Sequence, residues 1–198
     1  MQLFLNTTSP YARIARIALA EKGHADTPLE IVDPWSDAAR LLDVNPAARV
    51  PTLVADGGRS LTESLLIVFW LEHRTPEPSL LGQDATAVVA RTGLAMGVID
   101  AAVHTLIGRK ITDASFDTAP VGLRRRRTMA DGISRLESDP PTCADSSPTL
   151  DAIAAVVALD YLDFRFPAVE WLPAAPALRA LGAQLGTRPS FHTSRPHA

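Results

Sequence analysis

The sequence predicts two domains: an α+β domain with its elements in the order βαβαββα, followed by an all-α domain. Three observations predict this arrangement. The first third of the chain alternates short apolar segments with turn residues, a polar stretch with two prolines and a glycine follows, and long apolar segments of helical periodicity make up the remainder. We therefore expect domains at residues 1–75 and 84–198, joined by a linker at residues 76–83.

The expected elements of the first domain are short. Ser9 caps a helix that has Pro10 at its first position and ends at Gly23. The Asp56-Gly57-Gly58 segment favours a hairpin. Strands are predicted at residues 1–6, 29–32, 52–55 and 59–61, and further helices at residues 36–43 and 65–71. This order of elements is that of a thioredoxin-like fold.

The second domain is expected to contain helices only, because its apolar residues follow a helical period. A serine- and proline-rich segment at residues 138–148 interrupts this pattern and predicts a loop. One helix is predicted at residues 84–109, and a second runs through the arginine cluster and ends at residue 137. Two more are predicted at residues 149–164 and 177–185.

Charge and hydropathy restrict the classes of partner. The formal net charge of the 198 residues is −3 and the pI is about 5.9, so no global basic field favours nucleic acid or an anionic membrane. The consecutive arginines Arg124–Arg127 spread over the whole circumference of a helix, and we expect them to be solvated or salt-bridged. The longest strongly apolar run is expected to be too short to cross a bilayer, and no secretory signal is recognised.

Cysteine and histidine usage restricts the chemistry further. A single cysteine, Cys143, cannot form an internal disulfide, which fits a reducing cytoplasm and makes cytoplasmic localisation the expectation. The five histidines show neither i, i+4 pairing nor a cysteine partner, so we expect no metal site.

Two loops of the first domain are suited to holding a peptide. The Val50-Pro51 bond between a loop and a strand favours a cis peptide that exposes the backbone of Val50, although a plain turn at the strand entry has the same sequence. Glu63 and Ser64 open an apolar helix whose free N–H groups can hold a carboxylate. Alternatively, they form a capping turn with Thr62 or Ser64 as the cap. Together the two loops suit a short peptide with a free α-carboxylate.

The motifs Ser9-Pro10-Tyr11-Ala12-Arg13, Arg49-Val50-Pro51 and Glu63-Ser64, followed by an all-helical half, resemble those of the cytosolic glutathione S-transferase superfamily. Three segments resemble its bacterial YibF-like members: Thr8-Ser9-Pro10-Tyr11, Gly97-Val98-Ile99-Asp100 and Tyr161-Leu162-Asp163-Phe164-Arg165. The resemblance covers essentially the whole chain. It implies a homodimer, a glutathione site on the first domain and a hydrophobic co-substrate pocket between the two domains.

The resemblance assigns the sulfur of glutathione to Ser9. A hydroxyl at the start of a helix can donate a hydrogen bond to a thiolate, and the helix N-terminus adds positive potential. The alternative is an ordinary N-cap serine, and Thr8 is a possible substitute hydroxyl.

The resemblance also implies how the rest of the tripeptide is held. Val50 and Pro51 would meet its cysteinyl backbone, while Ser64 binds the γ-glutamyl carboxylate and Glu63 the γ-glutamyl ammonium. Arg49 would either help a carboxylate or remain solvated.

Residues outside this site are assigned by the resemblance to the co-substrate pocket. They are Tyr11, Met96, Asp100 and His104. Asp100 has the alternative of a structural hydrogen bond to the first domain. Asp151 comes one place early for the Ser/Thr-x-x-Asp box that many members of the superfamily carry at the start of the third long helix.

The implied activity is conjugation of the glutathione thiolate to small hydrophobic electrophiles. Two alternatives remain open. One is a glutathione- or apolar-ligand-binding protein without useful turnover. The other is a glutathione-dependent thiol reductase, which would normally need a cysteine in place of Ser9.

Overall fold

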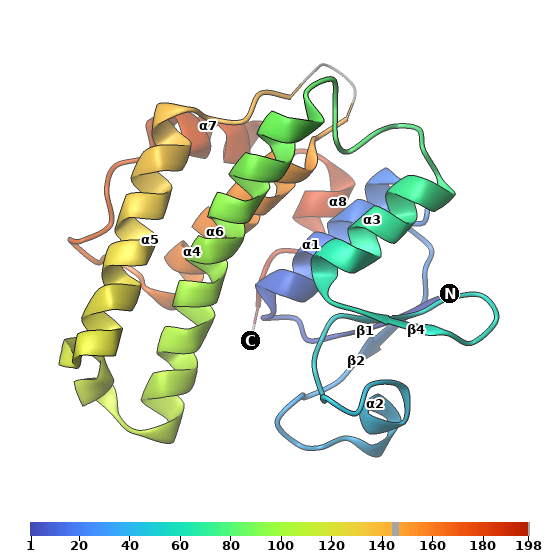
Figure 1. Cartoon of the computed structure of the whole chain (residues 1–198), viewed down its shortest axis with the longest axis horizontal. Coiled ribbons are helices and arrows are strands. Elements are labelled where there is room, and N and C mark those ends of the chain that lie inside the picture. The colour runs from blue at the N-terminus through green and yellow to red at the C-terminus, as the bar shows by residue number, and fades with distance from the viewer. Residues whose placement is uncertain (144–146, 198) are drawn as a thin grey trace. The chain divides into compact units, whose positions relative to one another are not determined.

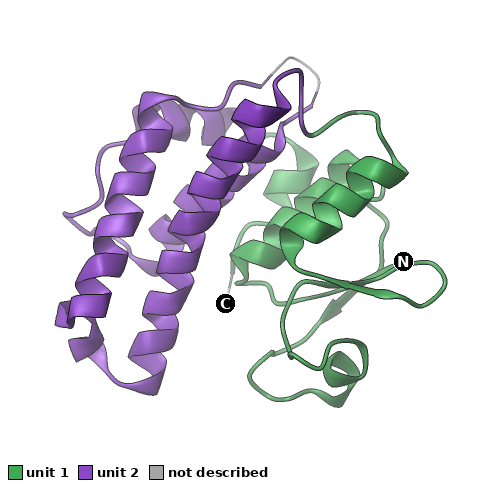
Figure 2. Ribbon diagram, in the orientation of Figure 1, with its two compact units in different colours: residues 1–80, 186–198 green, residues 81–185 purple. Residues whose placement is uncertain are grey.

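The computed structural model of the chain describes residues 1–143 and 147–197 and contains two compact units (Figure 2). Unit 1 combines residues 1–80 with residues 186–198, and unit 2 consists of residues 81–185. The last segment of the chain, which was expected in the second domain, belongs to unit 1, and the expected linker at residues 76–83 is divided between the two units. Within the expected loop at 138–148, residues 144–146 lie outside the described residues.

Unit 1 is built on one four-stranded sheet with the strand order β2-β1-β3-β4. β1 and β2 are parallel, whereas β1 with β3 and β3 with β4 are antiparallel. The strands are β1 (Gln2–Leu5), β2 (Leu29–Ile31), β3 (Thr52–Val54) and β4 (Ser60–Thr62). All four lie within or next to the predicted strands, and the thioredoxin-like fold is confirmed.

Helices cover both faces of this sheet because successive side chains of a strand point to opposite faces. Phe4 packs on one face with Val32 and with Leu41 of α2 (Ala39–Val44). On the other face lie α1 (Pro10–Glu21) and α3 (Ser64–Arg74), which pack against each other (Figure 1). α2 starts later than the predicted helix at 36–43, because Ser36 first forms a turn in which its N–H and its hydroxyl both donate to Asp33 O.

The C-terminal segment returns to unit 1 and packs on α1. It contains α8 (Pro189–His192), a short helix that was not predicted. Arg188 donates two hydrogen bonds to the buried carboxylate of Glu21, Nε to Oε1 at 3.0 Å and Nη2 to Oε2 at 2.6 Å, and the Ser190 hydroxyl donates to the same carboxylate. Bidentate geometry at a buried acid is the strong form of an Arg–carboxylate pair, so this contact anchors the segment.

Unit 2 is helical, as predicted. Its elements are α4 (Ala85–Ile111), the short 3-10 helix η1 (Ala114–Thr118), α5 (Pro120–Ser138), α6 (Leu150–Arg165) and α7 (Pro176–Leu185). α6 is buried on almost its whole circumference and packs against α4 and α7. A helix that is apolar all round belongs in a core, and α6 is the centre of this unit.

α4 is longer and more apolar than the sequence analysis allowed. By length and composition alone it could cross a membrane, contrary to the expectation that the apolar runs are too short. It packs along α5 and α6, which is how a core helix of a globular domain is placed. Gly132 of α5 permits the close approach, because a Cβ at this position would lie 2.3 Å from Val98 Cγ2 of α4.

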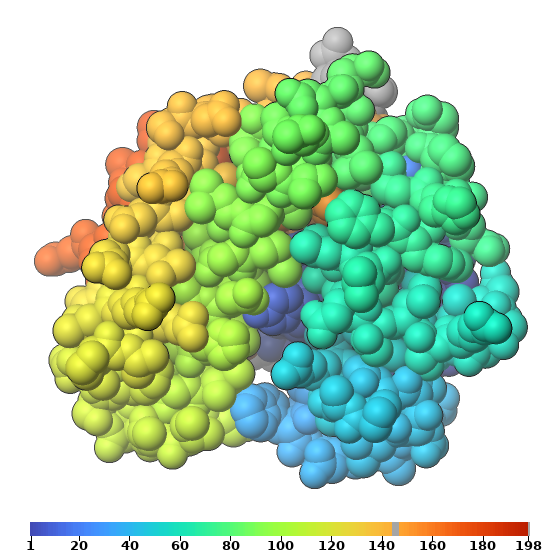
Figure 3. Space-filling model, viewed as in Figure 1, coloured from blue at the N-terminus to red at the C-terminus, as the bar shows by residue number. Residues whose placement is uncertain are grey.

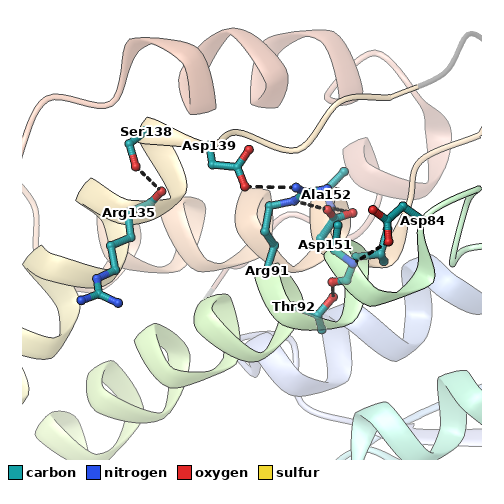
Figure 4. A network of polar contacts seen from close by, with 10 residues as sticks. Asp84, Arg91, Thr92, Arg135, Ser138, Asp139, Asp151 and Ala152 are labelled. Carbon is teal, nitrogen blue, oxygen red and sulfur yellow. Dashed lines mark hydrogen bonds and ion pairs between the residues drawn. The ribbon is translucent and has the colours of Figure 1, made fainter.

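An arginine links the start of α4 to the start of α6 (Figure 4). Arg91 Nε donates to the buried carboxylate of Asp151 at 2.7 Å, and Arg91 Nη1 donates to Asp139 at 3.2 Å. Thr149, the N-cap of α6, makes no side-chain capping bond. Asp151, one place early for a capping box as the sequence indicated, pairs with Arg91.

A buried lysine holds unit 1 together where α1 ends. Lys22 Nζ donates to the backbone carbonyls of Thr75 at 2.8 Å, Pro76 at 3.2 Å and Pro78 at 2.6 Å. It also forms an ion pair with Glu72, and the lysine side chain has no exposed surface. An ammonium has only three protons, and here four oxygen atoms compensate its desolvation.

We expect Lys22→Met to lower the free energy of unfolding by roughly 3 to 5 kcal/mol, because it leaves a carboxylate and three carbonyls without their shared donor. Urea titration followed by circular dichroism measures the loss. Arg40→Met is the control, since the Arg40 side chain, which pairs with Glu30, is 70% exposed and its loss should cost less than about 1 kcal/mol. Equal losses in the two variants would contradict the structural role of Lys22.

Candidate functional site

The two loops singled out in the sequence meet at one end of the sheet. Thr52 of β3 pairs with Thr62 of β4, so the residues before β3 lie beside those after β4. The Val50–Pro51 peptide bond is cis, as expected. Arg49 Nη1 lies 3.7 Å from Glu63 Oε1, and both side chains are exposed. The structure thus brings Arg49, Val50, Pro51, Glu63 and Ser64 into one neighbourhood.

Two residues that the sequence analysis missed hold the loop that leads into β3. The buried Asn45 side chain donates from Nδ2 to Arg49 O and to Thr52 Oγ1, both at 3.0 Å, and accepts from Ala47 N at 3.1 Å. The Thr52 hydroxyl donates to the same Arg49 carbonyl at 2.9 Å. Arg49 O is thereby fixed by two donors, and the backbone that follows it toward Val50 is fixed with it.

The N-terminus of α3 offers unsatisfied donors to this neighbourhood. Ile67 N bonds to Glu63 O, so the N–H groups of the residues before Ile67 have no acceptor in their own helix. Glu63 is the N-cap and makes no side-chain capping bond. The Ser64 side chain is 3% exposed, and its hydroxyl has no hydrogen-bond partner among the described residues. Ser64 and the helix terminus together can donate hydrogen bonds to an anion.

Glu63 has a backbone conformation that residues other than glycine rarely adopt. Its φ is 65° and its ψ is 120°. Such a conformation costs on the order of 1 to 3 kcal/mol and is found mostly where the surroundings require it, often at binding sites. At this position it turns the chain from β4 directly into the N-terminus of α3.

Three consecutive hydroxyl side chains occupy the turn between β1 and α1. The Thr7 hydroxyl donates to His197 O at 2.9 Å, and the Thr8 hydroxyl donates to Asn6 Oδ1 at 2.7 Å. Ser9 Oγ accepts from Ala12 N at 3.2 Å, which makes it the N-cap of α1. A capping oxygen still has its own proton to donate, and no described residue accepts the proton of Ser9.

Asn6 organises this turn, and nothing in the sequence pattern singled it out. Its Oδ1 also accepts from Thr8 N at 3.0 Å, its backbone carbonyl accepts from Ser9 N at 3.1 Å, and its Nδ2 donates to Val32 O at 3.2 Å. Asn6 therefore accepts the hydrogen bond of the Thr8 hydroxyl, and it connects the end of β1 by a hydrogen bond to the residue that follows β2. Of the three hydroxyls, Ser9 is the one placed to donate to a ligand.

The remaining candidate residues lie on other elements. Tyr11 lies in the first turn of α1 in unit 1, whereas Met96, Asp100 and His104 lie on α4 in unit 2 at intervals of four residues. That spacing places them on one side of the helix. His104 Nδ1 lies 2.7 Å from Asp100 O, so it must carry the proton and donate. Among the described residues, no group of histidine, cysteine and acidic side chains could hold a metal ion.

Comparison with known proteins identifies the family to which the chain belongs. The family model for the glutathione S-transferase N-terminal domain matches residues 8–74. A solved glutathione S-transferase from Methylobacterium radiotolerans, in complex with glutathione sulfonate, is 36% identical with a TM-score of 0.87, and the match covers 100% of this chain and 95% of that one. The chain belongs to the glutathione S-transferase superfamily.

Two further members of the superfamily extend the comparison. The GST-like protein YibF of Escherichia coli (strain K12) is 28% identical over 99% of this chain and 98% of its own length. Maleylacetoacetate isomerase of Pseudomonas aeruginosa is 27% identical over 98% of this chain and 93% of its own length. The resemblance stated from the sequence motifs is confirmed, including the similarity to a YibF-like protein.

We expect Asn45→Ala to lower the free energy of unfolding by about 1 to 3 kcal/mol, because buried polar groups around Arg49 O and Thr52 lose a partner. The measurement is chemical denaturation combined with amide hydrogen exchange, in which the Ala47 amide should exchange faster because it loses its acceptor, Asn45 Oδ1. Ser36→Ala is the control, since that exposed hydroxyl also donates to a backbone carbonyl. An unchanged exchange rate of the Ala47 amide would mean that Asn45 does not hold the loop.

Proposed function

We propose that this protein is a glutathione transferase that stabilises the glutathione thiolate with the hydroxyl of Ser9. The observation that carries the proposal is the uncommitted proton of Ser9 at the N-terminus of α1, beside two hydroxyls whose protons are committed elsewhere. The glutathione sulfonate bound to the relative from Methylobacterium radiotolerans supports the choice of ligand.

The rest of the tripeptide is assigned to the loops at the end of the sheet. The buried hydroxyl of Ser64 and the free N–H groups of α3 hold the γ-glutamyl carboxylate, and the exposed carboxylate of Glu63 meets the ammonium. The backbone of Val50 makes no hydrogen bond within the described chain and is left to pair with the cysteinyl residue. Arg49 stands beside Glu63 and balances its charge where the zwitterion binds.

The chemistry begins with loss of the thiol proton of glutathione to solvent. The Ser9 hydroxyl donates a hydrogen bond to the thiolate, and the partial positive charge at the helix N-terminus favours the same anion. Lowering a thiol pKa by one unit takes about 1.4 kcal/mol, which one charge-assisted hydrogen bond supplies. The thiolate then forms a bond to the electrophilic carbon; the electron pair of the bond that breaks departs with the leaving group or, in an addition, passes to the adjacent atom, which takes a proton from solvent. Holding both reactants in one site supplies the remaining gain in rate.

The site gives no support to a thiol reductase. The position at the start of α1 holds Ser9, and the one cysteine of the sequence, Cys143, lies in unit 2. The second candidate is a glutathione-binding protein without turnover, since the same groups hold the tripeptide whether or not an electrophile follows. The 27% sequence identity with maleylacetoacetate isomerase also leaves open an isomerase activity, in which the electrophile is rearranged rather than conjugated.

We expect Ser9→Ala to raise the thiol pKa of bound glutathione by one unit or more. Conjugation at neutral pH should slow roughly tenfold, with little loss of affinity for glutathione. Ultraviolet absorbance of the thiolate, titrated against pH, measures the pKa, and a model aromatic electrophile reports the rate. A native complex with an unshifted thiol pKa would favour the binding protein. Absence of glutathione binding would refute the assignment.

The control for this variant is Asp84→Ala. Asp84 caps α4 through a bond from Ala87 N at 3.0 Å, as Ser9 caps α1. Each substitution should lower stability by about 1 kcal/mol through the lost cap, but only Ser9→Ala should move the thiol pKa. Thr8→Val tests the other hydroxyl, whose proton is committed to Asn6, and should leave the thiol pKa in place.

The proposal includes a homodimer in which the outer face of α3 is a contact. Leu66 is 61% exposed and Phe69 is 39% exposed, one turn apart on a helix whose other face is buried. We expect Leu66→Asp to shift the native mass from dimer to monomer in sedimentation, because it places a charge in the contact. Ile31→Asp changes an equally exposed apolar residue on β2 and should leave the mass unchanged.

A further inference from the structure

One end of unit 2 combines exposed aliphatic residues with a dense positive charge. We call it the basic tip and define it as residues 109–127, which comprise the end of α4, η1 and the start of α5. The same segment is yellow-green in Figures 1 and 3 and lies at the surface of the molecule. The basic tip belongs to unit 2, whereas every residue assigned to glutathione belongs to unit 1.

The aliphatic residues of the basic tip are unusually exposed. Ile111 is 72% exposed, the highest value among the exposed large apolar residues of the described chain, and Val121 and Leu123 are 46% and 48% exposed. Every residue from Lys110 to Ser115 is exposed. A helix end in water does not require three aliphatic side chains on its surface, so these residues indicate a contact with something apolar.

The charge of the basic tip is strongly positive although the chain as a whole carries a formal charge of −3. The segment contains six basic and two acidic side chains. Arg109 makes a bidentate bond with Asp117, at 2.8 and 2.6 Å, and holds the pKa of that carboxyl below its usual value. The side chains of Arg124, Arg125 and Arg127 have no partner among the described residues.

A packed aromatic residue joins the three elements of the basic tip. Phe116 of η1 lies between two glycines: a Cβ at Gly108 of α4 would lie 2.4 Å from its ring, and a Cβ at Gly122 of α5 would lie 1.9 Å from its carbonyl oxygen. No larger residue fits either position without a shift. Ile111 follows the first glycine by one helical turn, and Val121 and Leu123 flank the second on opposite sides of α5.

We propose that the basic tip docks this protein reversibly on an anionic phospholipid surface. Arginines pair with lipid phosphates while their stems and the neighbouring aliphatic side chains enter the interface, which is the composition of interfacial membrane-binding segments. The positive charge complements anionic headgroups. Nucleic acid would also be attracted by the positive charge, but it would make no favourable contact with Ile111, because single strands stack on aromatic side chains rather than on aliphatic ones.

The test uses the full chain and sucrose-loaded vesicles of phosphatidylcholine, with or without phosphatidylglycerol. We expect co-sedimentation at least tenfold stronger with the anionic vesicles, and weaker as salt rises from about 0.05 to about 0.5 M. Ile111→Ser should reduce the partition coefficient about fivefold at unchanged charge. Arg124→Gln and Arg127→Gln should each reduce it roughly fivefold.

Matched controls lie outside the basic tip. Ile31→Ser removes an aliphatic side chain that is 68% exposed on β2, and Arg59→Gln removes an exposed arginine of the β3–β4 hairpin. Neither should change the partition coefficient. The proposal is overturned if anionic vesicles are not bound, if both vesicle types bind equally, or if the controls act like the tip variants. A salt-sensitive gel shift with single-stranded DNA that Ile111→Ser leaves intact, in the absence of vesicle binding, would assign the tip to polyanions instead.

Discussion

The ammonium of Lys22 is the interaction on which the geometry of unit 1 depends. It lies where α1 and α3 both end, and it bonds to the carbonyls of Thr75 and Pro76 and to Glu72. A cation is also favourable at the C-terminal ends of helices, where the backbone dipoles leave partial negative charge. Because the two helices share their C-terminal end, their N-termini open toward the same end of the unit, and these carry Ser9 and Ser64.

The candidate site is assembled mainly by amide side chains that do not face the ligand. Asn6 and Asn45 each bond to backbone atoms several residues away and so fix the two turns that precede Ser9 and Val50. Each amide offers two donor hydrogens on its nitrogen and an acceptor on a separate oxygen atom, a combination that a hydroxyl or a carboxylate does not have. The proposed recognition is thus divided, since the side chains of Ser9, Glu63 and Ser64 are assigned to the tripeptide, whereas the amides of Asn6 and Asn45 hold the turns.

The fold could be predicted from local pattern more fully than the site could. Alternation and capping gave the strands of unit 1 and the long helices of unit 2, because these signals act over a few residues. The short α8 was missed because its stability comes from the contact of Arg188 with Glu21, far away in the sequence. The choice of Ser9 over Thr8 depends on Asn6, a hydrogen-bond partner that no periodicity reveals. The resemblance to the family supplied the ligand, which the residues alone described only as a short peptide.

The return of the C-terminal segment to α1 has a consequence for how the protein is made. Unit 2 is one continuous stretch, residues 81–185, whereas unit 1 needs residues 186–198 as well as residues 1–80. During synthesis on the ribosome, Glu21 therefore cannot pair with Arg188 until the whole of unit 2 has been synthesised. The unit whose residues emerge first is the one completed last. A chain stalled before residue 186 would carry a complete helical unit and an N-terminal unit in which Glu21 still lacks Arg188.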